Sequence, residues 1–229
     1  MTTTSRSAPA TARAVARREL TQAIVEEARR QLTEVGPAAL SVRAVARELG
    51  MASSAVYRYF ATRDELITAL LVISYDELGE VARAADAAVR RRRDFAARWL
   101  AITRAIRNWA REHRFDYALL YGSPVPGYAA PADTIVPATR VLRVLLDLMT
   151  DAAPAEGPQP SIPRAARRAV ASARAFAGPA FTDELTYRAL VAWSAVIGSL
   201  TLELFGHLHN AVDDYDAWFE QSMLRIAPL

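Results

Sequence analysis

Residues 41–63, SVRAVARELGMASSAVYRYFATR, gather side chains whose chemistry suits contacts with nucleic acid. Serine hydroxyls and tyrosine phenols hydrogen-bond to phosphate oxygens or base edges, and an arginine binds phosphate or guanine. Val56 and Phe60 stand at i, i+4 spacing and are expected to face a core. The polar groups left outward or at the margin are those of Ser53, Ser54, Tyr57, Arg58 and Tyr59.

Two short helices separated by a glycine are predicted to position these side chains. Apolar residues at i, i+3, i+4 and i+7 spacing in residues 42–49 indicate the first helix, with Ser41 as its N-cap. Gly50 supplies the positive φ that ends this helix. Ser53 or Ser54 is predicted to cap a second helix of barely two turns. This order is that of a helix-turn-helix, whose second helix lies in the DNA major groove.

The run LGMASSAVYRYFATRDEL resembles the DNA-binding signature of TetR-type transcriptional regulators, and the upstream Val35-Gly36 and Leu40-Ser41-Val42 match it as well. The resemblance implies phosphate contacts from Ser41, Tyr57, Tyr59 and Arg63, and places Ser53, Ser54 and Arg58 near bases or backbone. Arg43 and Ala55 complete the predicted DNA-binding set. Ser53 stands where a lysine is common and Ala55 where a serine or threonine is common, so each removes a usual phosphate contact.

Composition narrows the class of protein. The chain has 229 residues, of which 52% are hydrophobic, and it carries a formal net charge of +3. It contains no cysteine, which excludes disulfides, thiolate zinc sites and cysteine nucleophiles. No segment approaches ~20 uninterrupted apolar residues, and the N-terminal stretch lacks the apolar region of a signal peptide. We therefore expect a cytoplasmic protein with no membrane partner.

The positive charge is concentrated near the helix-turn-helix. Residues 1–63 hold ten arginines against five acids, a net +5, whereas residues 64–229 hold eighteen arginines against twenty acids, a net −2. A basic head on a nearly neutral body is the electrostatic pattern expected of a nucleic-acid-binding protein.

The predicted fold is all-α with two domains. Residues 1–16, rich in Thr, Ser, Ala and Pro, are expected to form a flexible arm. Residues 17–63 are expected to form a three-helix DNA-binding domain, whose first helix runs from Arg17 to Val35 and stops at Gly36-Pro37. Residues 64–229 are expected to form a larger helical bundle for ligand binding and dimerisation.

Apolar periodicity predicts the helices of the larger domain. Thr62 and Glu65 form a capping box that starts a long helix reaching about Val89. Further helices are predicted over 94–112, 134–149, 183–210 and 213–224, with a Gly/Pro loop over 122–131 and a mobile Pro-rich loop over 151–164. The last two helices are apolar around most of their circumference, which suits the interface of a homodimer.

The C-terminal region resembles the ligand-binding domain of the TetR subgroup named for a Trp, a His and a Gly, through YALLYGSPVPGY and AWSAVIGSLTLELFGHL. Trp193 and Gly198 take the Trp and Gly positions, but Ile197 takes the His position, which predicts a more apolar pocket. Ligand pockets are mostly apolar with a few polar groups. The candidate ligand-binding residues are Trp99, Trp109, Tyr117, Tyr121, Phe176, Trp193 and Ile197, and ordinary core packing is the alternative for each of them.

Two further features have alternative interpretations. Glu203 and His207 share a helix face at i, i+4 spacing, but a metal site needs a third ligand and His209 points elsewhere, so neither a metal nor a cofactor is expected. The run Arg90–Arg93 is either a solvated helix end or an accessory contact with phosphate or an acidic ligand.

The function expected from the residues and the resemblance is a homodimeric regulator that binds double-stranded operator DNA. It would be a repressor that a small apolar or aromatic effector releases, and not an enzyme. The alternatives are a DNA-binding dimer that acts constitutively or through a protein partner, without an effector, and a metal-dependent helical hydrolase using Glu203 and His207.

Overall fold

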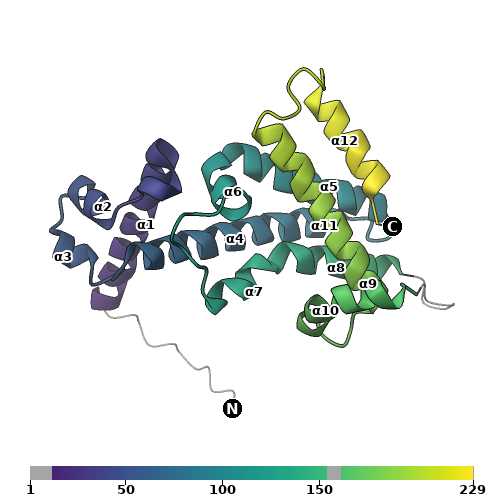
Figure 1. The fold of residues 1–229 in the computed structure, drawn as a ribbon, viewed down its shortest axis with the longest axis horizontal. Coiled ribbons are helices and arrows are strands. Elements are labelled where there is room, and N and C mark those ends of the chain that lie inside the picture. Colours follow the sequence, from purple (N-terminus) through teal and green to yellow (C-terminus); the bar gives the residue numbers. More distant parts are fainter. Residues whose placement is uncertain (1–11, 154–160, 229) are drawn as a thin grey trace, which may run out of the picture. The chain divides into compact units, whose positions relative to one another are not determined.

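The computed structural model describes residues 12–153 and 161–228, and in these ranges it contains helices and no strand (Figure 1). The chain divides into two compact units. The N-terminal unit comprises the residues up to Leu70 together with Val125–Ala129, and the C-terminal unit comprises Leu71–Pro124 and the residues from Ala130 onward. The border after Leu70 falls inside a helix, whereas the sequence predicts a border between residues 63 and 64.

The N-terminal unit is built from α1 (Ala12–Ala39), α2 (Val42–Glu48), α3 (Ser53–Val56) and the first turns of α4 (Arg63–Ala88). Its buried apolar side chains come from all four helices and include Ile24, Ala28, Leu32, Val45, Val56 and Leu66. The spacing of these residues along α1, α2 and α4 is the helical spacing on which the sequence prediction rests.

Helix α1 differs from its prediction at both ends. It begins at Ala12, so residues 12–16, which are expected in the flexible arm, are helical, while residues 1–11 lie outside the described residues. At the other end Gly36 adopts φ 74° and ψ 170°, and the helix resumes for one short turn to Ala39. Gly36-Pro37 therefore kinks the helix where the sequence predicts a stop.

In the part of the chain that the structure describes, the C-terminal unit contains the rest of α4 and nine further helical segments. These are α5 (Phe95–Glu112), α6 (Arg114–Tyr121), the 3-10 helix η1 (Ala132–Thr134), α7 (Ile135–Ala138), α8 (Arg140–Ala152), α9 (Arg164–Ala169), α10 (Ala171–Ala177), α11 (Asp183–Leu204) and α12 (Tyr215–Ile226). Helix α11 crosses α8 and also contacts α5 and α12 (Figure 1). Of the helices described, only α11 is long and apolar enough to suit a membrane span by length and composition, and its buried residues pack in this core.

Several segments of the C-terminal unit depart from prediction. The helix expected over 134–149 is divided at Thr139, two residues after Pro137, and continues to Ala152. Helix α11 ends at Leu204 because Gly206 and Asn210 turn the chain with positive φ values of 79° and 63°. Helices α6, α9 and α10 occupy stretches for which no helix or strand is predicted. Residues 154–160 of the predicted mobile loop lie outside the described residues.

Two buried arginines join helices across the C-terminal unit. Arg98 donates from Nε to Oδ1 of Asp86 at 2.7 Å and forms an ion pair with Asp151 at 2.8 Å. Arg107 donates to both carboxylate oxygens of Glu203, at 2.8 Å from Nη2 and 2.9 Å from Nε. Burial opposes the charge on Asp86, but hydrogen bonds from the arginines hold the pKa of this carboxyl below its usual value. These pairs neutralise charges that burial would otherwise make costly.

We expect Glu203→Ala to lower the free energy of unfolding by about 3 kcal/mol, because it removes the buried carboxylate of Arg107 and leaves only the exposed carboxylate of Asp216 as an ion-pair partner. The matched control is Glu220→Ala, whose carboxylate pairs with Arg104 at the exposed surface and whose loss should change stability by less than about 0.5 kcal/mol. Urea unfolding followed by circular dichroism measures both values. Equal stability for the two variants would show that the Arg107 pair is not a significant support of this core.

Candidate nucleic-acid interface

A tight turn after α2 sets the start of the short helix α3. Gly50 has φ 64°. The amides that follow the helix donate to its last carbonyls: Gly50 N donates to Arg47 O at 3.0 Å, and Met51 N donates to Ala46 O at 2.8 Å. This pair of bonds is a Schellman motif, which ends a helix at a glycine with positive φ. The prediction that Gly50 turns the chain is confirmed.

The serines near the two helix starts do not act as the predicted caps. Ser41 occupies the N-cap position of α2, but its side chain makes no capping hydrogen bond. Ala52 is the N-cap of α3, so Ser53 and Ser54 lie in its first turn instead of capping it. Within the described residues the three serine hydroxyls make no hydrogen bond, which leaves them as donors and acceptors for a partner molecule.

Helix α3 is shorter than predicted, but hydrogen-bonded turns continue beyond its end. The regular helix ends at Val56, and the following turn is held by bonds such as Tyr59 N to Val56 O at 2.8 Å and Phe60 N to Val56 O at 3.1 Å. Val56 and Phe60 are buried as predicted. Their burial directs Tyr57, which is 39% exposed, and Arg58 toward solvent.

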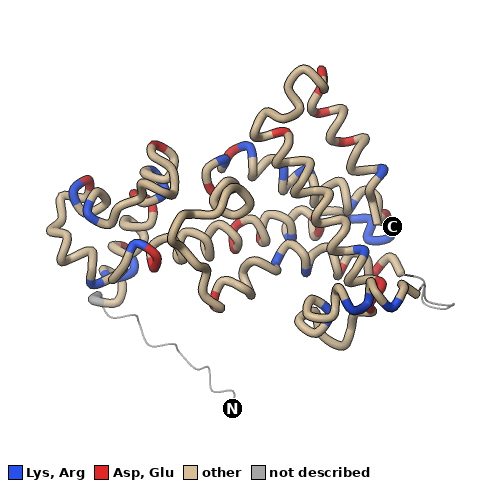
Figure 2. Tube along the Cα trace, viewed as in Figure 1, with Lys and Arg blue, Asp and Glu red and all other residues tan. Residues whose placement is uncertain are grey.

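Most arginines of the N-terminal unit whose side chains the structure describes have partners, so the unpaired ones among them are informative. Arg30 pairs with Glu27 and Glu34, and acidic residues follow basic ones closely along these helices (Figure 2). Arg43 and Arg58 are exposed and make no ion pair or hydrogen bond to any residue that the structure describes. Unpaired exposed guanidiniums on α2 and just beyond α3 are the groups best able to bind phosphate or guanine.

Tyr59 has a structural contact that sequence reasoning missed. The guanidinium of Arg17 lies over its ring at 5.2 Å from the centroid, a cation–π contact between α1 and the turn after α3. Tyr59 is half-buried, and its hydroxyl makes no hydrogen bond within the described residues. Only the missing carboxylate partner of Arg17 hints at this contact in the sequence.

Arg63 is engaged by the protein itself. Its Nη2 donates to Pro37 O at 2.7 Å and to Ala38 O at 3.2 Å, and its Nε donates to Leu40 O at 3.2 Å. These carbonyls lie at the end of α1 and before α2, where no helical amide reaches them. Through these bonds Arg63 joins α1, α2 and α4, while the phosphate contact that the resemblance implies for it stays a prediction.

Comparison with known proteins supplies the family of this fold. Residues 24–70 match the family described as "Bacterial regulatory proteins, tetR family", and residues 99–226 match "Tetracyclin repressor-like, C-terminal domain". The chain belongs to the TetR family of bacterial regulators. The predicted resemblance is therefore confirmed, while the likeness to the Trp-His-Gly subgroup stays a prediction.

Named relatives of this TetR-family chain are transcriptional regulators. The chain is 43% identical over 202 residues to the HTH-type transcriptional regulator Rv1816 of Mycobacterium tuberculosis and to Mb1846 of Mycobacterium bovis, with 83% of each chain covered. Among solved structures, the putative regulatory protein SCO4313 matches with a TM-score of 0.78 and 32% identity over 96% of this chain and all of that one. The protein is a DNA-binding transcriptional regulator and not an enzyme.

The C-terminal unit of the regulator holds an aromatic cluster that joins α4, α6 and α11. Tyr121 contacts the rings of Tyr75, Tyr117 and Trp193 at centroid distances of 6.1, 5.2 and 6.2 Å. The Tyr117 hydroxyl donates to Ile197 O at 2.9 Å. Four of the predicted ligand-binding residues, namely Tyr117, Tyr121, Trp193 and Ile197, are thus brought together.

Two polar groups of this aromatic cluster are buried without a hydrogen bond of good geometry to any described residue: the Tyr121 hydroxyl and Nε1 of Trp193. Burial raises the pKa of Tyr121, although the nearby indole of Trp193 lowers it slightly, and burial raises the pKa of Tyr117 to about 12. Both phenols are therefore neutral hydrogen-bond donors at physiological pH. Buried groups without partners mark a place where a ligand or water can supply the missing bond.

The other predicted ligand residues lie elsewhere in the C-terminal unit. Trp99 is fully buried, and its Nε1 donates to Met223 O at 2.7 Å, so it joins α5 to α12 as a core residue. Trp109 is buried and stacks on His113 at 5.1 Å. Phe176 is 44% exposed on α10 and lines a separate groove.

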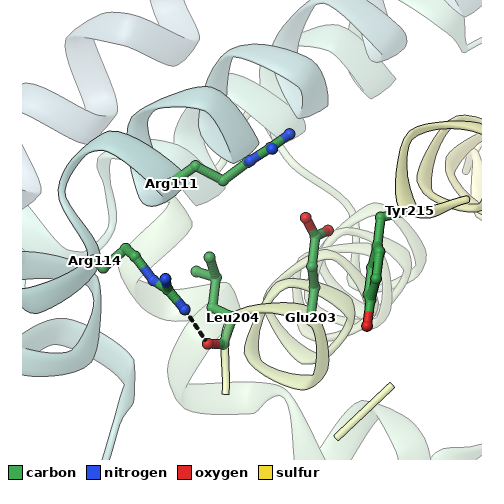
Figure 3. A pocket seen from close by; sticks show the side chains of 5 residues that line it. All are labelled: Arg111, Arg114, Glu203, Leu204 and Tyr215. Atoms are coloured by element: carbon green, nitrogen blue, oxygen red, sulfur yellow. Dashed lines mark hydrogen bonds between the residues drawn. The ribbon is translucent and has the colours of Figure 1, made fainter. Parts of the chain in front are cut away.

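A pocket of about 420 Å³ between α5, α6, α11 and α12 is lined by Arg111, Arg114, Glu203, Leu204 and Tyr215 (Figure 3). Polar side chains that line this pocket already have partners within the protein. Glu203 binds Arg107, and Arg114 donates to Leu204 O at 2.7 Å. Helix α11 ends before His207, so the helical spacing predicted for Glu203 and His207 is wrong. The described residues contain no cluster of three His, Cys, Asp or Glu side chains that could hold a metal.

Substitutions of Arg63 and Arg58 should distinguish a structural role from a DNA-contacting role. We expect Arg63→Ala to lower the free energy of unfolding by about 2 kcal/mol, because three backbone carbonyls lose a charged donor. The matched variant Arg58→Ala should change stability by less than about 0.5 kcal/mol. It should instead reduce the magnitude of the negative slope of log Kobs, the observed DNA-binding constant, against log salt concentration by about one.

Chemical unfolding and DNA titrations across a salt series measure these quantities. If Arg63→Ala kept full stability while its salt slope fell, Arg63 would contact phosphate directly and its positioning role would be wrong.

Proposed function

We propose that the protein is a cytoplasmic homodimeric repressor that binds operator DNA through α2, α3 and the turn after α3 and is released by a small apolar or aromatic effector. One observation carries the DNA-binding role: the guanidiniums of Arg43 and Arg58 are exposed and unpaired, and serine hydroxyls without hydrogen bonds accompany them. These groups lie on and just after the two short helices that the turn at Gly50 joins. Such groups bind phosphates and base edges when a short helix enters the major groove.

The proposed contact surface keeps most of the predicted residues. Ser41, Arg43, Ser53, Ser54, Ala55, Tyr57, Arg58 and Tyr59 are all exposed or half-exposed, so each is accessible to DNA. Arg63 contributes indirectly by fixing the junction of α1 and α2. Binding should be strongly salt-dependent, because the arginine contacts displace counterions from the phosphates.

Helix α11 carries the surface proposed for dimerisation. Tyr187, Val191, Leu202 and Phe205 are between 39% and 53% exposed and recur at helical spacing along one face of α11 and its cap. Gly198 lies on the same face, and nothing occupies the space beside its Cα. An apolar stripe of this length on a helix buried along its other face is explained by a second copy covering it. A twofold dimer also supplies the second recognition helix that a symmetric operator requires.

We expect Val191→Asp to convert the dimer into a monomer, because the aspartate would be desolvated at the centre of the stripe. Val136→Asp is the matched control, since Val136 is 62% exposed on α7 and lies outside the stripe. Light scattering after size-exclusion chromatography gives the mass of each variant, and circular dichroism checks its fold. A wild-type chain that is monomeric at micromolar concentration, or a Val191→Asp dimer, would contradict this interface.

The proposed effector site is the aromatic cluster of Tyr75, Tyr117, Tyr121 and Trp193. The cluster offers ring faces for an apolar or aromatic body, and the Tyr121 hydroxyl and Trp193 Nε1 are two donors that lack good partners. A ligand with an apolar body and one acceptor oxygen therefore complements the site. Such a ligand acts on DNA binding only if it prefers a conformation whose DNA affinity is lower.

A short loop segment offers a route for that coupling. Helix α6, which carries Tyr117 and Tyr121, leads into a loop whose residues Val125–Ala129 belong to the N-terminal unit. There Tyr128 shares a 2.9 Å hydrogen bond with Thr68 of α4. A ligand that shifts α6 would pull on this loop and so on the start of α4, where Arg63 positions α1 and α2.

A thermal-shift screen of small aromatic and acyl compounds tests the effector role, because a ligand of the folded state raises its melting temperature. We expect a hit that also weakens DNA binding, and we expect Trp193→Phe to reduce its affinity roughly fivefold or more by removing the indole donor. Trp218→Phe, on α12 and outside the cluster, is the matched control.

Two results would count against this proposal. A hit whose affinity is unchanged in Trp193→Phe binds elsewhere. If no compound alters DNA binding, the constitutive dimer without an effector becomes the better account.

A further inference from the structure

A groove on the C-terminal unit, distinct from the aromatic cluster, combines basic and apolar side chains. It has a volume of about 370 Å³ and is formed by α4, α7, α8 and α10. Its basic residues are Arg83, Arg140 and Arg143, and its apolar residues include Val136, Val144 and Phe176. None of the three arginines belongs to the DNA surface, the dimer stripe or the effector site described above.

A close helix crossing shapes one part of this groove. A Cβ added to Gly79 of α4 would lie only 2.5 Å from Cβ of Arg140, so α8 approaches α4 at a distance that only glycine permits. Arg140 lies at this crossing, and Arg83, one helical turn after Gly79 on α4, lines the same groove. Arginines from two helices are thereby directed into one space.

Each groove arginine uses only part of its hydrogen-bonding capacity. Arg83 donates from Nε and Nη2 to Glu80, Arg140 pairs through Nε with Asp76 at 2.8 Å, and Arg143 donates from Nη1 to Ala177 O. Among the described residues, no acceptor is bonded to Nη1 of Arg83 or to either terminal nitrogen of Arg140. These donors remain for an incoming anion, since a guanidinium has five N–H groups.

The apolar side of the groove is unusually open to solvent. Val136 is 62% exposed and Phe176 is 44% exposed, and both line the groove. Three arginines outnumber the two acids that also line it, Glu80 and Asp147. Phosphate or carboxylate alone would leave the valine and phenylalanine surfaces uncovered, and a purely apolar molecule would leave the guanidinium donors unused.

We propose that this groove binds an amphipathic anion, with a carboxylate head held by Arg83 and Arg140 and a hydrocarbon tail lying against Val136 and Phe176. The site is separate from the proposed effector site, so it stands whether or not the aromatic cluster binds a ligand. It would give the regulator a second ligand site.

Isothermal titration calorimetry with dodecanoate, below its micelle concentration, tests the proposal on the full-length protein. Dodecyltrimethylammonium, with the same tail and opposite charge, and 1-dodecanol, with no charge, are the matched probes. We expect saturable binding of dodecanoate, binding of the alcohol weakened roughly fivefold or more, and no saturable binding of the cation. Arg83→Gln and Phe176→Ala should each weaken dodecanoate roughly fivefold, since one removes a head donor and the other a tail contact.

Two control variants make the result specific. Arg104→Gln removes an exposed arginine that pairs with Glu220 on another face, and Trp193→Phe alters only the aromatic cluster, so both should bind dodecanoate as the wild type does. Thermal unfolding confirms that every variant is folded. Equal binding of anion and cation, unchanged affinity in Arg83→Gln, or loss of binding in Trp193→Phe alone would each overturn the groove as the binding site.

Discussion

The N-terminal unit depends on one guanidinium at the junction of its helices. Pro37 and Ala38 lie in the last turn of α1 after the kink at Gly36, and Leu40 lies between α1 and α2. Arg63 at the start of α4 donates to the carbonyls of all three. Carbonyls without partners near a protein interior are costly, so this single side chain fixes the angle between α1 and α2. The Schellman turn at Gly50 then fixes α3 on α2. DNA recognition relies on this rigidity, because base contacts tolerate little displacement of the recognition residues.

The C-terminal unit also uses arginine side chains to join its helices. Its core is apolar, yet Arg98 and Arg107 lie inside it and bind carboxylates from other helices. Replacement by apolar residues would often be as stable, so such pairs are better explained by the specific helix register that they impose. The Arg107 pair joins α5 to α11, and α11 carries Trp193, which contacts Tyr121 of α6 in the proposed effector site.

The sequence predicts what depends on local patterns. Helical spacing locates α5, the capping box Thr62–Glu65 locates α4, with Glu65 N bonded to Thr62 Oγ1 at 3.1 Å, and Gly50 marks the turn. Contacts between residues far apart in the sequence cannot be predicted from such local patterns. The sequence suggests a phosphate contact for Arg63 but does not indicate its bonds to carbonyls 23 to 26 residues earlier. Helices α9 and α10 are alanine- and arginine-rich and lack apolar periodicity, and Trp99 and Trp109 cannot be told from pocket residues by residue type alone.

Hydroxyl-radical footprinting most directly tests the central claim that a twofold dimer presents two α2–α3 surfaces to DNA. The DNA would be a sequence selected by the full-length protein from a random pool, bound at saturation. The account predicts two protected segments on one face of the duplex, related by twofold symmetry and centred about one helical turn, ~34 Å, or a multiple of it apart. A single protected segment, or a pool in which no sequence is enriched, would contradict it.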